Sequence, residues 1–288
     1  MKRALTAAAA MTALVLLSGA AAAQTTLRIG LAEDPDVLDP TLARTYVGRI
    51  VFSSLCDKLF DIDEKLNVVP QLALSHETSE DGKAVIIKLR PGVKFHDGEP
   101  LDAEAAKFSL DRHRTMQGSF RRPEVAAIDK VEVIDPLTIR LTLKTPFSPL
   151  ISQLTDRAGM MVSPKAAQEA GDKFGLKPVC AGPYKFVDRV QQDRIVVEKF
   201  ADYWNKDNVH IDRITYLPIV DATVRLANLK SGGLDLIERL AATDMAAVKS
   251  DSKLKLSKAV SVASTRSIRS RPPDRKLARR TVASTIGR

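Results

Sequence analysis

The stretch LRPGVKFHDGEP, residues 89–100, decides how this chain folds. The residues leading into it, 85–89, are apolar and mostly β-branched, which predicts a short strand. Pro-Gly at 91–92 is a turn signal. Val93 and Phe95 then alternate with polar neighbours, a pattern typical of a second, half-buried strand.

A helix is expected directly after this stretch. Asp97-Gly98 forms a second turn signal, because glycine tolerates the positive φ that such turns need. Asp102 can then cap a helix over 103–116, and Glu104 suits the positive end of that helix. The predicted order is therefore strand, turn, strand, turn and the start of a helix, and none of these residues requires catalytic chemistry.

Five segments together resemble one known family. LRPGVKFHDGEP followed by LDAEAAKFSL resembles the signature of the solute-binding proteins of peptide/nickel (family 5) ABC importers. Four more segments match the family in order and spacing, over residues 27–260: GLAEDPDVLDP (30–40), AGPYKFVDR (181–189), EKFADYW (198–204) and RLANLKSGGLDL (225–236). The resemblance implies an α/β fold of the periplasmic-binding-protein type (type II, peptide-binding class), of which this chain holds mostly the first lobe.

The resemblance also predicts the domain organisation. Residues 24–260 would form the first lobe of a solute-binding domain, including a smaller inserted subdomain at roughly 65–170. The resemblance stops near residue 261, where the family continues into a second lobe. Residues 261–288 are rich in Arg and Ser and lack apolar periodicity, so we expect a basic, disordered tail and a truncated chain.

The N-terminus has the pattern of a signal peptide. Lys2-Arg3 precede an apolar run over 7–17, and Ala21-Ala22-Ala23 fit a small-residue cleavage site. The apolar run is too short to span a bilayer convincingly. We therefore expect cleavage after Ala23 and a periplasmic location.

The net charge of +9 lies at the two ends of the chain. Lys2 and Arg3 contribute +2, and residues 262–288 contribute +7, so the part between them carries no net charge. This distribution favours a solvated, mixed-charge surface over a nucleic-acid partner.

Cys56 and Cys180 are the only cysteines. An even pair in an exported chain suggests a disulfide, although two separate buried thiols remain the alternative. A bond between them would close a long loop, for which chain entropy alone predicts a stabilisation of about 5 kcal/mol.

The loop Glu33-Asp34-Pro35 is the candidate ligand-binding site. In the resembled family this loop faces the ligand cleft, where acidic side chains could meet a cationic group of the solute. The alternative is an acidic loop that is simply solvated.

No catalytic or metal site is indicated. The sequence has no nucleophile elbow, no phosphate-binding loop and no Cys-x-x-Cys pair, and its four histidines are far apart. His113 and Trp204 are more consistent with packing roles than with ligand contacts. We expect no enzyme activity and no cofactor.

The sequence therefore favours an exported, monomeric solute-binding component of an ABC importer, here truncated and impaired in binding. The expected ligand is a short peptide or a similar small polar solute, and the expected partner is a membrane permease. Two alternatives remain open: a secreted hydrolase, and a non-functional fragment of the binding protein.

Overall fold

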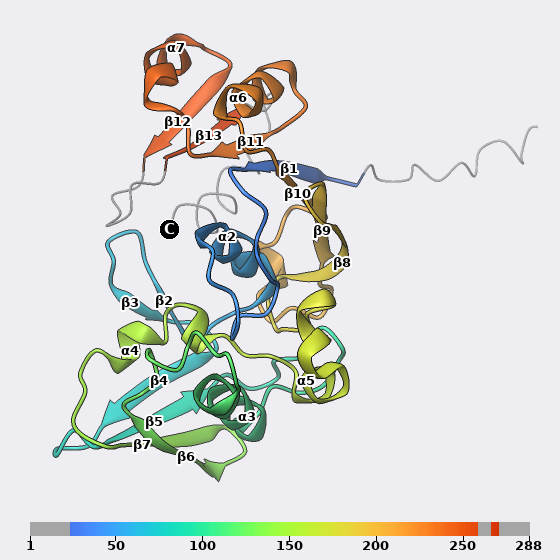
Figure 1. Cartoon of the computed structure of the whole chain (residues 1–288). Coiled ribbons are helices and arrows are strands. Elements are labelled where there is room, and N and C mark those ends of the chain that lie inside the picture. Colours follow the sequence, from blue (N-terminus) through green and yellow to red (C-terminus); the bar gives the residue numbers. More distant parts are fainter. Residues whose placement is uncertain (1–23, 259–265, 271–288) are drawn as a thin grey trace, which may run out of the picture.

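The chain folds into a large central sheet and a smaller sheet, each covered by helices (Figure 1). The structure is a computed structural model that describes residues 24–258 and 266–270. The expected signal peptide over 1–23 and most of the expected tail lie outside the described residues. The central sheet has the strand order β12-β13-β11-β1-β10-β9-β8, and the smaller sheet has the order β4-β5-β7-β6.

The elements have the following bounds. The central strands are β1 Thr26–Leu31, β8 Tyr184–Val190, β9 Arg194–Lys199, β10 Arg213–Pro218, β11 Leu236–Glu238, β12 Leu254–Lys258 and β13 Arg266–Ser270. The others are β2 Phe60–Ile62, β3 Val68–Pro70, β4 Ala73–Thr78, β5 Ala84–Leu89, β6 Ile128–Asp135 and β7 Thr138–Leu143. The helices are α2 Tyr46–Leu55, α3 Ala103–Thr115, α4 Leu150–Gln153, α5 Pro164–Ala170, α6 Ala222–Ser231 and α7 Met245–Ser250.

The central sheet is buried on both faces. Strand β1 runs parallel to both β10 and β11, as in α/β proteins whose helices cover both sides of the sheet. Ile29 and Leu31 of β1 pack into the core that contains α2, whereas Ile237 of β11 packs with the leucines of α6. The α/β fold expected from the sequence is confirmed.

The helix expected after the opening stretch is confirmed, but the strand within that stretch is not. The Asp102 carboxylate accepts a hydrogen bond from the Ala105 amide at 2.9 Å, which caps α3. Residues 93–96 form no strand; Lys94 makes only an isolated bridge with Pro100. Gly92 and Gly98 both have positive φ, so the chain turns too tightly around Val93 and Phe95 for a longer ladder. Val93 and Phe95 are nevertheless buried, as their apolar character requires.

The four-stranded sheet forms a distinct part of the molecule below the central sheet in Figure 1. Its strands lie within the span 65–170 for which a smaller subdomain is expected. Consecutive strands pair antiparallel, and α3 packs against β6 and β7. Ile87, Ile139 and Leu141 lie in the apolar core of this part.

Apolar residues recur at helical spacing over 46–60 and predict one amphipathic helix, but helix α2 is shorter than this. It ends at Leu55 because Cys56 adopts an extended conformation, with φ −130° and ψ 109°. Leu59 and Phe60, which the helical pattern included, instead enter the core of the smaller sheet. Local apolar spacing did not distinguish one helix from a helix followed by a strand.

Part of the expected disordered tail is a strand. Arg266–Ser270 form β13, which pairs antiparallel with both β11 and β12. Ile268 lies opposite Ile237 on one side and Leu256 on the other. For these five residues the prediction of disorder is wrong, because hydrogen bonds with two neighbouring strands outweigh weak local propensity.

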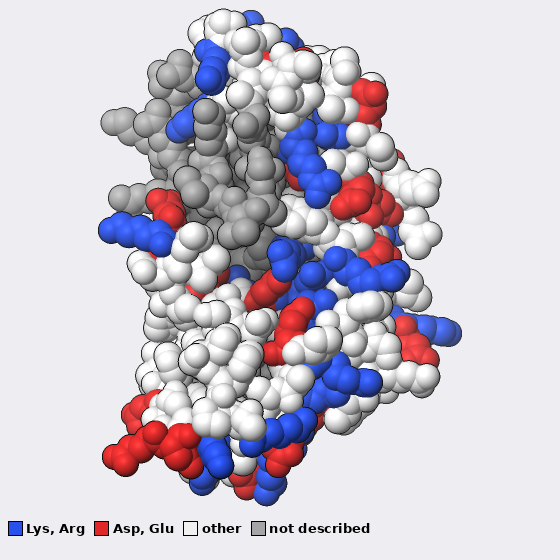
Figure 2. All heavy atoms as spheres, turned by 60° about the vertical axis from the view of Figure 1, so that its left-hand side comes forward, with Lys and Arg blue, Asp and Glu red and all other residues white. Residues whose placement is uncertain are grey.

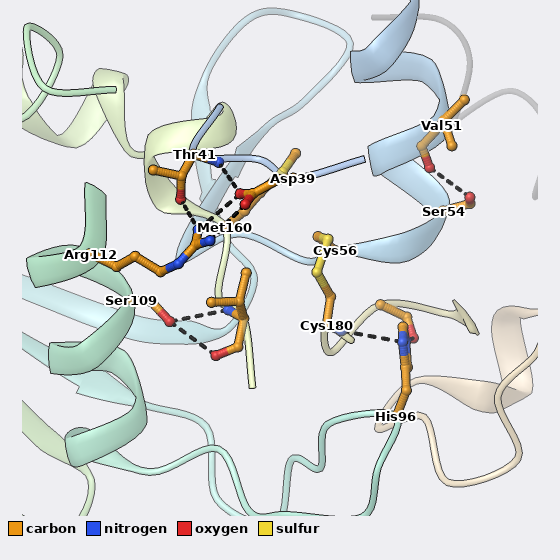
Figure 3. Close-up of a disulfide and its surroundings, with 12 residues drawn as sticks. Asp39, Thr41, Val51, Ser54, Cys56, His96, Ser109, Arg112, Met160 and Cys180 are labelled. Atoms are coloured by element: carbon orange, nitrogen blue, oxygen red, sulfur yellow. Dashed lines mark hydrogen bonds and ion pairs between the residues drawn. A yellow bond between two sulfur atoms is a disulfide. The ribbon is translucent and has the colours of Figure 1, made fainter. Parts of the chain in front are cut away.

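Cys56 and Cys180 are joined by a disulfide, with their Cα atoms 4.9 Å apart (Figure 3). The bond links the end of α2 to the segment that leads into β8. His96, from the opening stretch, lies beside it: the Cys180 amide donates to Nδ1 at 3.3 Å, and Nε2 donates to the Gly182 carbonyl at 3.1 Å. The carbonyl can only accept, so Nε2 of His96 carries a proton. Because Nδ1 accepts from the Cys180 amide, it carries none, and His96 is neutral.

A buried ion pair joins α3 to the segment before α2 (Figure 3). The Arg112 guanidinium binds both carboxylate oxygens of Asp39, at 2.8 and 2.6 Å. The adjacent His113 is fully buried and donates from Nε2 to the Met160 carbonyl at 3.1 Å, while its Nδ1 lies 3.0 Å from the Thr41 hydroxyl. The packing role predicted for His113 is confirmed.

Trp204 also has the packing role expected for it. Its ring packs against the cores of both sheets. Its Nε1 donates to buried Asp57 at 2.8 Å, and the Tyr203 hydroxyl donates to the same oxygen at 2.9 Å. Gln71 donates to the other oxygen of Asp57 at 3.0 Å, so this carboxylate joins elements from both parts of the molecule.

Buried titratable groups make stability depend on pH. Burial lowers the pKa of His96 and of His113 to about 4, and it raises the pKa of Asp57 to about 6. A lowered histidine pKa adds stability that is present above pH ~6.5 and is lost as the pH falls through about 4. The raised carboxyl pKa acts in the opposite direction, adding stability at low pH that is lost as the pH rises through about 6.

We therefore expect the free energy of unfolding to fall on acidification from pH ~6.5 to ~4, by about 1.4 kcal/mol per pH unit for each net proton taken up on unfolding. The two histidines outweigh Asp57 in this range. The raised pKa values of Glu124 and Glu238 act with Asp57. The lowered pKa values of Asp36 and Asp212 act with the histidines. Chemical denaturation at several pH values measures the slope. The variant His113→Gln should make the slope shallower, whereas the same change at exposed His210 should not. An equal slope in all three proteins would contradict this assignment.

Candidate functional site

The carboxyl ends of three parallel strands meet at one edge of the central sheet. Strand β1 lies between β10 and β11 and runs parallel to both. In open α/β sheets, ligands bind in the crevice outside the carboxyl ends of the strands. In Figure 1 the chain leaves β1 at this edge and descends to α2. The fold therefore favours a ligand-binding site at this edge of the sheet.

Glu33 is the residue of the predicted loop that offers an accessible charge at this edge. Its side chain is 43% exposed, and Oε1 lies 4.0 Å from Nη2 of Arg239, which is 41% exposed. Arg239 directly follows β11, and its guanidinium carbon lies 5.3 Å from the centre of the Tyr46 ring at the start of α2. Two opposite charges and an aromatic face thus come together from three elements.

Asp34 and Pro35 lie beside Glu33, but their polar groups are bound to β8 and to the turn after it. The Asp34 carboxylate pairs with Arg189 at 3.1 Å and accepts from the Gln192 amide at 3.0 Å. Arg189 also donates to the Pro35 carbonyl, and Pro35 is buried. In the predicted site, these two residues fix the loop that carries Glu33.

Glu238, the last residue of β11, binds the backbone at the residue before Glu33. Its carboxylate is buried, and Oε1 accepts from the Ala32 amide at 2.8 Å. Oε2 has no hydrogen-bond partner and lies 3.4 Å from Nε of Arg239. Burial raises the pKa of Glu238, and the nearby guanidinium of Arg239 opposes that rise.

Sequence reasoning missed Arg239, Glu238 and Tyr46. The sequence did give one signal for Glu238 and Arg239. The run over 234–237 predicts a short buried strand, and charged residues that directly follow such a strand belong to the carboxyl edge of the sheet. Tyr46 gave no such signal, because its ring fits equally well on the apolar side of a helix.

A second candidate, between α3 and β6, is a solvated mixed-charge face. Its charged residues already pair with each other, as in Lys107–Asp111 at 2.5 Å and Arg114–Asp111 at 2.6 Å. Figure 2 shows acidic and basic side chains interspersed over another face of the molecule. Neither surface has the uniform positive charge typical of nucleic-acid binding.

Within residues 24–258 and 266–270, no group of His, Cys, Asp and Glu side chains is arranged to hold a metal ion. No helix in the same residues is long and apolar enough to cross a bilayer.

A family model matches residues 67–274; its description is bacterial extracellular solute-binding proteins, family 5 Middle. The chain is 40% identical over 196 residues to the glutathione-binding protein GsiB of Pectobacterium atrosepticum, covering 68% of this chain and 38% of that protein. It is 35% identical over 221 residues to GsiB of Escherichia coli K12, covering 76% of this chain and 43% of the relative.

A solved structure shares the fold. The binding protein AgaA of A. tumefacien R10, in complex with agropinic acid, aligns with a TM-score of 0.77 and 32% identity. The alignment covers 81% of this chain and 48% of AgaA. The chain thus spans about half the length of that structure and less than half the length of the two GsiB relatives.

Proposed function

The chain belongs to the bacterial extracellular solute-binding proteins of family 5, and on that basis we propose that it is the exported solute-binding component of an ABC importer. The relatives it matches are solute-binding proteins, not enzymes. The proposed ligand is a short peptide or a similar small polar solute. The proposed partner is a membrane permease, and the proposed state is a periplasmic monomer whose residues 1–23 have been removed as a signal peptide.

One observation carries this proposal beyond family membership. Glu33, Arg239 and Tyr46 come from three separate elements and converge at the carboxyl edge of the parallel strands. A small polar solute is bound by a few well-placed charged groups beside an apolar or aromatic wall. We propose that the loop Glu33-Asp34-Pro35 lines the site beside the aromatic wall formed by Tyr46. Glu33 contacts the solute, and Asp34 and Pro35 hold the loop in place.

We further propose that this chain alone binds solute weakly. The candidate site residues Glu33 and Arg239 are both more than two-fifths exposed, so a solute bound between them would keep much of its hydration. Binding proteins of the two-lobe type gain affinity by closing a second wall over the ligand. This chain spans less than half of its glutathione-binding relatives.

Calorimetric titration with glutathione tests this proposal. We expect the intact E. coli relative to bind glutathione at least about 100-fold more tightly than this chain, because burial of polar contacts sets most of the affinity. A chain that binds as tightly as the relative would contradict the proposed impairment. A chain that binds no solute even weakly would instead favour the non-functional fragment.

A further inference from the structure

The backbone of Arg239 is held in a conformation that an arginine rarely adopts. Its φ is +53°, in the left-handed region, where the Cβ atom of a residue with a side chain comes too close to the following carbonyl oxygen. Such strain persists only where the surroundings enforce it, and it is concentrated at functional sites.

Arg225 of α6 enforces that conformation. Its side chain is buried, and its guanidinium donates to the carbonyls of Ile219 and Val220 at 2.6 and 2.7 Å. The same guanidinium donates to the Arg239 carbonyl at 3.1 Å. Arg225 therefore links the backbone of Arg239 to the segment after β10. This contact fixes the position of the Arg239 backbone at the carboxyl edge of the sheet.

The Arg239 side chain is held in place by an ion pair between its Nε atom and the buried carboxylate of Glu238. Nη2 lies 4.0 Å from Glu33, beyond hydrogen-bond distance, so this exposed ion pair contributes little. Nε lies 3.4 Å from the buried Glu238 oxygen that has no hydrogen-bond partner. A ligand carboxylate could thus bind the two Nη atoms of Arg239 while Nε keeps its contact with Glu238, and a ligand cation could bind Glu33. Only the weak contact between Glu33 and Arg239 would be given up.

We propose that Glu33 and Arg239 form a subsite for an α-amino-acid head group, a carboxylate and an ammonium on one carbon atom. Arg239 donates to the carboxylate, Glu33 accepts from the ammonium, and the hydrocarbon part lies against Tyr46. The short spacing of the two protein charges requires ligand charges that are equally close, which a peptide's two termini are not. This inference rests on the proposed function, because it specifies the solute that the site takes.

Arginine suits the carboxylate because its planar guanidinium donates two parallel hydrogen bonds to the two oxygens. Other charged groups at this edge are engaged elsewhere. Asp34 is paired with Arg189, and Arg49, whose guanidinium carbon lies 5.9 Å from the Tyr46 ring centre, is paired with Asp156.

Titrations of the isotope-labelled full chain followed by nuclear magnetic resonance test the inference, because the method detects binding at about 10 mM ligand. Three probes are compared. Glutathione carries the head group on its γ-glutamyl end, N-acetylglutathione lacks the ammonium, and trialanine has its charges at opposite ends. We expect glutathione to bind at least about tenfold more tightly than the other two, since each of them loses a hydrogen bond between charged groups.

Two variants locate the subsite. Glu33→Gln should remove the preference for glutathione over N-acetylglutathione, and Arg239→Gly should weaken glutathione binding by about tenfold or more. Glycine adopts a positive φ freely, so the second variant adds no backbone strain, and its denaturation curve shows whether the loss of the Glu238 partner affects folding. Glu99→Gln is the matched control: Glu99 has the same 43% side-chain exposure as Glu33 and pairs with Lys165, away from this edge.

Each outcome decides the question. If glutathione binds and both site variants bind it like the unaltered chain, the subsite is wrong while the proposed function stands. The subsite is also wrong if trialanine binds as well as glutathione does. If no probe binds at any concentration, the proposed function fails together with the subsite.

Discussion

Replacing Gly182 by alanine should unfold the chain or cost roughly 3–5 kcal/mol of stability, a loss at the upper end for single substitutions. A Cβ atom on residue 182 would lie 2.4 Å from the carbonyl carbon and 2.5 Å from the carbonyl oxygen of Leu55. Both are backbone atoms at the end of α2, so no side-chain rotation relieves the contact. Thermal and chemical denaturation of Gly182→Ala measure the loss.

The surroundings of Gly182 cannot move apart easily. Its amide donates to the Leu55 carbonyl at 2.9 Å, and its own carbonyl accepts from His96. The disulfide holds the neighbouring backbone on both sides. Gly233→Ala is the control, because there the nearest atom is the Asn228 side-chain oxygen at 3.1 Å, which can rotate away. Equal stability of the two alanine variants would refute the clash.

Removing the disulfide should cost about 5 kcal/mol by chain entropy, because the bond closes a loop between residues 124 positions apart. The double variant Cys56→Ser with Cys180→Ser removes the cross-link and keeps side chains of similar size. Its free energy of unfolding, from denaturant titration, should fall by this amount relative to the oxidised chain.

Reduction of the unaltered chain provides the comparison. Both sulfurs are buried, so a reductant should act on the unfolded chain and shift the unfolding midpoint by a similar amount. If reduced and oxidised chains unfold at the same denaturant concentration, the cross-link does not stabilise the protein. If only the serine variant is destabilised, the loss comes from buried hydroxyl groups instead.

Local chemistry explains the parts of the fold that the sequence predicts well. Helix α6 begins where Asp221 accepts from the Val224 amide at 2.9 Å, and it ends at Gly232, whose φ is +82°. Proline is favoured in the first turn of a helix, so Pro164 predicts a helix start, and helix α5 indeed spans Pro164–Ala170 with Ser163 as its cap. Caps and turn glycines act within one helical turn, so their positions can be read from neighbouring residues alone.

The sequence-based predictions of secondary structure are wrong where contacts between distant segments determine the structure. Helix α2 stops at Leu55 because Cys56 meets a partner that is far away in the chain. Arg266–Ser270 become a strand because two other strands flank them.

The candidate site could be predicted only in part for the same reason. The family resemblance indicated Glu33, but its contact with Arg239 joins residues from opposite ends of the described sequence. The conformation of Arg239 depends on Arg225. Neither the Glu33–Arg239 contact nor the Arg225–Arg239 hydrogen bond can be predicted from the residues of a single segment.

The position of β1 in the middle of the central sheet also dictates the order in which the molecule assembles. Thr25, next to β1, binds Asp212, next to β10, across 187 residues of chain. The smaller sheet, by contrast, contains the hairpins β4–β5 and β6–β7, and its remaining pairing, of β5 with β7, joins residues that are much closer in the chain, such as Ile86 and Arg140. Closing a long loop costs more entropy than closing a hairpin, so the smaller sheet should form early and the central sheet late. A chain that becomes available from its N-terminus onward would then keep β1 unpaired until β10 and β11 follow, and during that interval the unpaired edges of β1 would be exposed to aggregation.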